Sequence, residues 1–159
     1  MTTWIGTLPT WVAGEDILAA DLDTMTDALA ALTDVWTTYT PTWSSTGTQP
    51  AIGNGTVAGD YFQAGKTVVA RIRIVMGSTT TFGTGQYFVT LPVAGVVASI
   101  AGACYMLDFG TANKSATCLI TSALTTIAAV QNTADFGATT PHTWANGDRF
   151  DASIVYEVA

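Results

Sequence analysis

Basic residues are scarce in this sequence, and their scarcity excludes two classes of partner. Only five Lys or Arg residues stand against twelve Asp or Glu residues, so the formal net charge is −7. No cluster of basic residues occurs along the chain. A field of this sign repels the phosphate backbones of nucleic acids and the headgroups of anionic membranes. The sequence therefore disfavours nucleic-acid binding and membrane association.

Histidine is almost absent, which limits the possible catalytic chemistry. The one histidine, His142, lies in a segment rich in Pro and Thr, so a Ser-His-Asp or Cys-His site would have a single candidate base. The carboxylates of residues 37–159 are scattered, and neither a calcium-binding loop nor a phosphate-binding loop is present. We therefore expect an exposed His142 and a protein with no catalytic site, no cofactor and no metal. A metal site that takes one His142 from each of three subunits is an unsupported alternative.

Cysteine is also rare. Cys104 and Cys118 lie in the apolar runs AGACYML and SATCLIT. Cysteines in such surroundings behave as small hydrophobic residues, so we expect two buried free thiols. A disulfide would require that their two strands are neighbours, which the sequence does not determine.

Charged residues of either sign make up only 11% of the chain, against about 25% in an ordinary soluble domain. The mean hydropathy is +0.36. Residues 74–107 carry no charge, but they include Pro92, Gly95 and Gly102 and many small side chains. A membrane-spanning helix needs about 20 strongly apolar residues, so buried strands explain this run better. The first residues lack the basic and apolar regions of a signal peptide. The high hydropathy suggests apolar surface that is buried between subunits.

A strict heptad spacing is present in residues 17–36. Large apolar side chains follow one another at intervals of 4, 3, 4, 3 and 4 residues: Leu18, Leu22, Met25, Leu29, Leu32 and Trp36. This repeat is typical of a coiled-coil seam, and we expect a helix over 17–36 whose seam is an oligomer interface. Asp16 is the expected N-cap, and Asp21 and Asp23 complement the helix dipole. The alternative is an amphipathic helix that packs on its own domain.

Residues 37–159 have the composition of a β domain. Thr, Val, Ile, Tyr and Phe dominate, with Gly, Asn and Ser between the runs. Two alternating segments that meet at Ala64-Gly65 predict a hairpin, and Asn54-Gly55 suits a type I′ turn. Eight or nine short strands without an intervening helix predict an antiparallel β-sandwich of jelly-roll-like type. Aromatic side chains of this domain are expected in the core and at subunit interfaces rather than on sugars: Tyr39, Trp43, Tyr61, Phe62, Phe82, Tyr87 and Trp144.

Two stretches of the chain resemble a known family. TWVAGEDILAADLDTMTDALAAL resembles an N-terminal segment of short fibre-like and minor tail proteins of phages, especially phages of actinobacteria. YTPTWSSTGTQPAIGNGTVAGDYFQAGKTVVARIRIVMGSTTTFGTGQYFVTLP and the closing WANGDRFDASIVYEVA are similar to the β domain that often follows. This sequence has Ala19 where Thr is common and Asp23 where Asn is common. The resemblance implies a trimer in which residues 1–16 form an anchoring arm, with Trp4, Trp11 and Gly14 as anchor residues.

The expected function is therefore that of a virion structural protein without enzymatic activity. We expect a short homotrimeric fibre or minor tail protein that is assembled in the host cytoplasm and attached through residues 1–16 to a capsid or tail protein. A capsid-decorating protein at a threefold site is one alternative. A carbohydrate-binding or host-surface-binding module is another, and an enzyme is the most distant.

Overall fold

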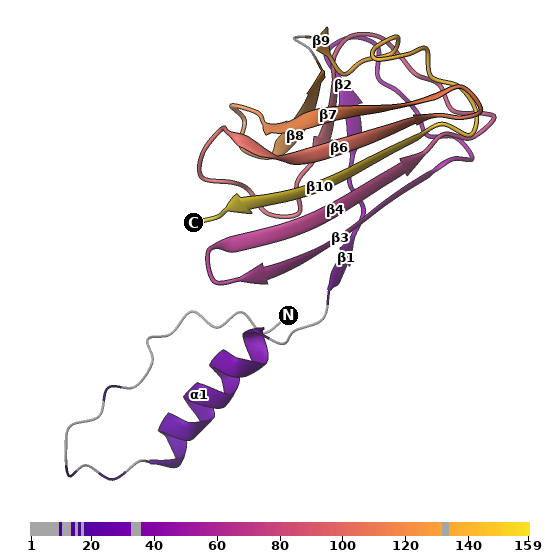
Figure 1. The fold of residues 1–159 in the computed structure, drawn as a ribbon. Helices are drawn as coiled ribbons and strands as arrows, with labels where there is room; N and C mark the ends of the chain where they lie inside the picture. The colour runs from indigo at the N-terminus through magenta and orange to yellow at the C-terminus, as the bar shows by residue number, and fades with distance from the viewer. Residues whose placement is uncertain (1–9, 11–13, 15, 17, 33–35, 132–133) are drawn as a thin grey trace.

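The structure is a computed structural model that describes residues 10, 14, 16, 18–32, 36–131 and 134–159. It has one helix in this part of the chain, α1 (Ala19–Leu32), which lies apart from the body of strands (Figure 1). The strands are β1 (Thr37–Tyr39), β2 (Trp43–Ser45), β3 (Thr56–Ala64), β4 (Thr67–Val75), β5 (Tyr87–Thr90), β6 (Ile100–Asp108), β7 (Ala112–Ile120), β8 (Thr126–Gln131), β9 (Ala134–Asp135) and β10 (Arg149–Glu157). The prediction of a mainly β protein with one short helix is confirmed. Within the described residues, no helix has the length and apolarity that crossing a bilayer requires.

All ten strands belong to one antiparallel sheet, in the order β1-β3-β4-β10-β6-β7-β8-β5-β2, with β9 paired to β8. The central strands alternate strictly: Ile72 and Ile74 of β4 face the core, whereas Arg71 and Arg73 face outward. This period of two is the pattern of a sheet with one buried and one exposed face. The hairpin predicted at Ala64-Gly65 is confirmed as β3 and β4.

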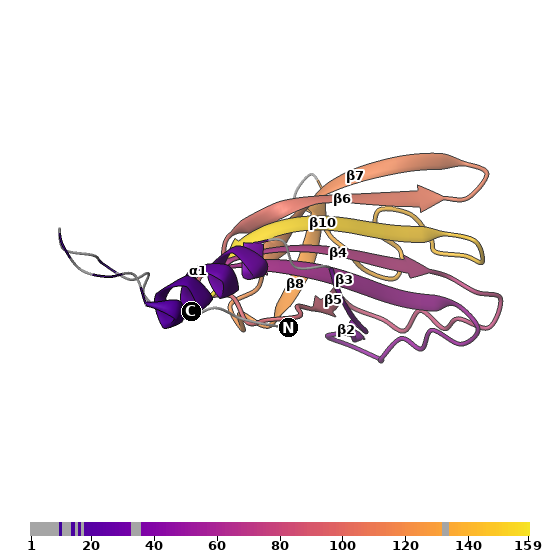
Figure 2. The same cartoon turned by 90° about the horizontal axis from the view of Figure 1, so that it is seen from below.

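The sheet curls until its two ends meet. β1 and β2 stand at opposite ends of the strand order, yet only three residues, 40–42, connect them. The Tyr39 hydroxyl donates to the Thr90 carbonyl at 3.4 Å, and the Thr42 N–H donates to Thr90 Oγ1 at 2.8 Å. In Figure 2, β2 and β5 lie beneath the layer of β3 and β4. The predicted sandwich has two separate sheets, whereas the observed layers belong to one curled sheet.

An aromatic cluster fills the space inside the curl. Trp43, Tyr87, Phe136 and Trp144 follow one another in edge-to-face contacts with ring centroids 5.0–5.4 Å apart, and Phe150 of β10 stacks on Phe136 at 4.7 Å. All five side chains are buried. Edge-to-face pairs at these distances are favourable because the positive edge of one ring meets the negative face of another. The prediction of a core role is confirmed for Trp43, Tyr87 and Trp144.

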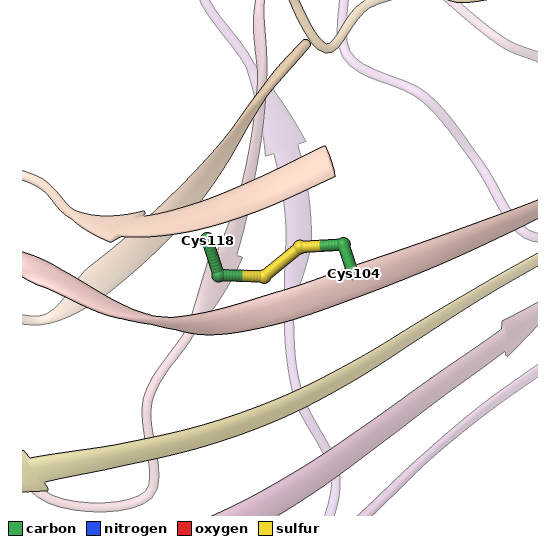
Figure 3. Close-up of a disulfide and its surroundings, with 2 residues drawn as sticks. All are labelled: Cys104 and Cys118. Carbon is green, nitrogen blue, oxygen red and sulfur yellow. A yellow bond between two sulfur atoms is a disulfide. The ribbon is translucent and has the colours of Figure 1, made fainter. Parts of the chain in front are cut away.

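A disulfide bridge joins Cys104 of β6 to Cys118 of β7 (Figure 3). The two strands are hydrogen-bonded neighbours, and Cys118 pairs in register with Gly102, two residues from Cys104. The Cα atoms are 5.9 Å apart, within the range that a disulfide requires. The expectation of two free thiols is therefore wrong, because the pairing of β6 with β7 brings the cysteines together.

The N-terminal part differs from the expected helix in its ends. α1 begins at Ala19, and the Asp21 carboxylate accepts a hydrogen bond from the Leu18 N–H at 3.1 Å, as in one half of a capping box. The predicted cap at Asp16 is wrong, since Leu18 stands at the cap position.

The turn prediction at Asn54-Gly55 is also wrong. A type I′ turn needs a positive φ at both residues, whereas the positive φ, +60°, belongs to Gly53.

Alkaline pH is expected to unfold the sheet because two buried tyrosines hold their protons tightly. Burial raises the pKa of Tyr87 and of Tyr156 from 10.0 to about 12. The stability that they contribute is complete below pH 10 and is lost as the pH rises through 12. Each tyrosine lowers the free energy of unfolding by about 1.4 kcal/mol per pH unit in this window. Urea unfolding followed between pH 8 and 12 measures the loss. A free energy of unfolding that stays constant between pH 10 and 12 would contradict the assignment.

Candidate functional site

The leucine seam of α1 is exposed. The exposed fractions are 62% for Leu18, 53% for Leu22 and 61% for Leu29, and Met25 is half-buried. At about 100° per residue these four side chains fall within an arc of about 60° on one side of the helix. The β domain therefore does not cover the seam, as the alternative of a helix packed on its own domain would require.

The other residues of the predicted interface and anchor lie at or beyond the ends of the helix. Leu32 is the last residue of α1, and Trp36 lies outside it. The Arg71 guanidinium stands over the Trp36 ring at 3.9 Å from the centroid, so Trp36 contacts the sheet. Gly14 is exposed and has a φ of +95°. Trp4 and Trp11 lie outside the described residues.

The outer face of the sheet carries a row of ion pairs. Arg71 of β4 donates two hydrogen bonds of 2.8 Å to the Asp60 carboxylate of β3. The hydrogen bond that Arg71 donates to the Asp60 carboxylate raises the pKa of Arg71. Arg73 and Arg149 both approach Asp151 at 2.6 Å. Because the Arg71 and Arg73 side chains are more than half exposed and their partners remain partly exposed, the pairs contribute little to stability.

An open groove of about 850 Å³ crosses this face. Four residues of the ion pairs line it, Asp60, Arg71, Arg73 and Asp151, together with Tyr105, Ser115 and Ser153. Such a surface offers hydrogen-bond donors and acceptors to a polar ligand, although typical small-molecule sites are deeper and more apolar.

Three potential metal ligands meet at one end of the sheet. Asp108 is the last residue of β6, and His142 and Asp148 belong to the long connection from β9 to β10. One ligand atom from each side chain lies within 4.8 Å of the others. The distance from His142 Nε2 to Asp148 Oδ2 is 3.3 Å. We refer to these three residues as the Asp-His-Asp cluster.

The backbone holds Asp148 firmly in this cluster. Its Oδ1 accepts a hydrogen bond from the Phe109 N–H at 2.8 Å, and its Oδ2 accepts one from the Ala145 N–H at 2.7 Å. The Asp148 side chain is only 2% exposed. It therefore ties the turn after β6 to the connection that precedes β10.

His142 is buried, which corrects the expectation of an exposed loop residue. Its side chain is 6% exposed, and its ring lies 4.3 Å from the Trp144 ring, centroid to centroid. Among the described residues, neither ring nitrogen has a hydrogen-bond partner. The Trp144 indole N–H donates to the Gly137 carbonyl at 3.0 Å. This hydrogen bond holds in place the indole ring that the imidazole contacts.

The sequence gives little local sign of this cluster. Asp108 and Asp148 lie forty positions apart, and the register that sets Arg149 opposite Leu107 brings their backbones together. The run PHTWANGD does contain both His142 and Asp148. Its Gly147, with a φ of +90°, lies at the turn that directs the carboxylate back towards the loop. Both cysteines are in the disulfide, so neither can serve as a nucleophile beside His142.

Comparisons with known proteins do not assign this chain to a class. No family model matches it, and neither a curated protein nor a solved structure is significantly similar to it.

Proposed function

We propose that this protein is a non-enzymatic structural component of a phage particle, a short homotrimeric fibre or minor tail protein. The observation that carries the proposal is the exposed leucine seam of α1, a helix that lies apart from the β domain (Figure 1). The number of three subunits and the particle rest on the resemblance of residues 10–32 and of the β domain to phage fibre proteins.

The physical argument concerns the cost of leaving the seam in water. Full burial of one leucine side chain stabilises by about 1.5–3 kcal/mol. Leu18 and Leu22 alone would supply six such side chains in a trimer. A helix of 14 residues is marginal by itself, so α1 gains stability when three copies bundle. The arrangement is a short parallel coiled coil, in which a and d side chains interdigitate along the axis.

In this proposal the three parts of the chain have separate tasks. Residues 1–16 attach to a capsid or tail protein, residues 17–36 form the coiled coil, and residues 37–159 form a sandwich-like head on the particle surface. The particle is assembled in the host cytoplasm. Attachment at a threefold position of the capsid, as a decorating protein, is the closest alternative, and it requires the same trimer.

A second candidate function is binding of a host-surface glycan by the head. The open groove beside Asp60, Arg71 and Asp151 supports it, because paired carboxylates and guanidinium groups can bind sugar hydroxyls. The groove is present on every copy, so a trimer would offer three sites and gain from multivalency.

The test is the mass of the full chain in solution. Light scattering at micromolar concentration is expected to give three times the chain mass of 16.5 kDa. A monomer at that concentration would overturn the proposal of a trimer. Electron microscopy of particles that carry a labelled copy would then separate a tail location from a capsid location.

A further inference from the structure

We propose that the Asp-His-Asp cluster binds one divalent transition-metal ion per chain, with Zn²⁺ as the best-fitting ion. Asp108, His142 and Asp148 supply one ligand atom each. The ion would join the end of β6 to the connection that leads into β10. It therefore has a structural role, independent of the number of subunits.

The buried imidazole is the first argument. A polar group inside a protein almost always has a hydrogen-bond partner, because an unsatisfied group loses its bonds to water. His142 is 6% exposed, and neither of its nitrogens has such a partner among the described residues. Its Nε2 lies 3.3 Å from the Asp148 carboxylate but makes no hydrogen bond to it. A metal ion between the two would satisfy this nitrogen.

The spacing of the donors is the second argument. Zinc bonds to nitrogen and oxygen are about 2.1 Å long, so two ligands of a tetrahedral ion lie about 3.4 Å apart. The distance from His142 Nε2 to Asp148 Oδ2 is 3.3 Å. The atom from Asp108 lies within 4.8 Å of the other two, so small side-chain rotations complete the set.

The charges of the site form the third argument. Two carboxylates that share a partly buried site repel each other unless a cation lies between them. Within the described part of the chain, Arg149 is paired with Asp151 on the outer face, and no Lys or Arg forms an ion pair with Asp108 or Asp148. A divalent cation would balance both carboxylates.

The donor types select the ion. One imidazole nitrogen and two carboxylate oxygens suit Zn²⁺, whereas Ca²⁺ takes six to eight oxygen ligands. Three protein ligands leave a fourth position, which water can fill. The backbone bonds to Asp148 from Phe109 and Ala145 would fix one ligand before the ion arrives, as outer hydrogen bonds do in zinc sites.

Zinc titration of the untagged full chain, after treatment with a chelator, tests the proposal. Calorimetry is expected to give one ion per chain with a micromolar or lower dissociation constant. Because His142 is the sole histidine of the chain, its ¹⁵N ring signals report on the site without ambiguity, and the Nε2 signal is expected to shift on zinc addition. A hundredfold excess of zinc over the dissociation constant is expected to raise the melting temperature by about 5 °C or more.

Asp108→Asn is the main variant, because no hydrogen bond to the Asp108 side chain is present in the described residues. The apo variant is expected to melt at or above the temperature of the apo wild type, because the repulsion between the two carboxylates is removed, while its zinc affinity falls at least tenfold. His142→Asn is expected to abolish binding. Asp135→Asn removes an exposed carboxylate outside the cluster and should bind zinc as the wild type does.

Absence of zinc binding to the wild type at micromolar concentration would overturn the proposal. An unchanged affinity in both Asp108→Asn and His142→Asn would also overturn it, since the ion would then lie elsewhere. If the His142 ring signals do not shift when the protein is saturated with zinc, the ion does not bind at His142 and the proposal is likewise overturned.

Discussion

Leu22→Asp is expected to separate the proposed trimer into folded monomers. The substitution sets one carboxylate from each of three chains against the same axis, where each is removed from water and none meets a basic partner. Each buried, unpaired charge costs several kcal/mol, more than the burial of one leucine supplies. The mass from light scattering should fall to that of one chain, whereas the strand signal in circular dichroism should be unchanged, because α1 lies apart from the sheet (Figure 1).

Ala20→Asp is the matched control for the seam. Ala20 lies about 160° around the helix from Leu22, and a carboxylate in the first turn is favourable to the helix dipole. This variant should keep the mass of the wild type. Equal masses for Leu22→Asp and wild type would show that the seam is not the interface. Dissociation of both variants would indicate an effect on the helix rather than on the seam.

Loss of the disulfide is expected to have the second large effect. Cys104 and Cys118 close a loop with a sequence separation of 14 residues. A bridge across about 15 residues stabilises by about 3 kcal/mol in the chain-entropy account. The double substitution of both cysteines by alanine should therefore lower the free energy of unfolding by about this amount. For a protein of this size the melting temperature should fall by about 6–12 °C, which calorimetry measures.

The control for the disulfide is the effect of a reductant. Dithiothreitol should lower the melting temperature of the wild type and leave that of the double alanine variant unchanged. If the reductant has no effect on the wild type, the thiols are free in solution. Because cytoplasm keeps thiols reduced, a protein with the proposed role in a particle is expected to close this bridge only after the particle leaves the host cell. Alkylation of fresh lysates and of released particles would show free thiols in the first and none in the second.

The parts of the fold that the sequence predicts are those with a local signal. In β4, the alternation of Val68, Ala70, Ile72 and Ile74 with outward residues is complete over nine positions, and Gly65 marks the turn before it. Both features depend on neighbours in sequence. The predicted hairpin and the observed hairpin therefore agree.

The parts that the sequence misses depend on contacts between distant residues. The environment of His142 is set by Asp148 and by the end of β6, and Cys104 meets Cys118 only once β6 pairs with β7. The curl that joins β1 to β2 depends on Thr90. The start of the helix, by contrast, depends on neighbours in sequence: the Asp21 carboxylate accepts a hydrogen bond from the N–H of Leu18, three residues earlier.

The position of β10 determines when the head can fold during synthesis. This strand is translated last among the ten, yet it lies between β4 and β6 and pairs with both. It therefore joins the part of the sheet that ends at β4 to the part that begins at β6. At 5–20 residues per second, the ribosome needs about 6–25 s to proceed from the end of α1 to the end of β10. Throughout that interval the leucine seam of the nascent chain is complete while its head is open. In the proposed trimer, chains on one messenger would therefore meet through their helices first, and their heads would close side by side afterwards.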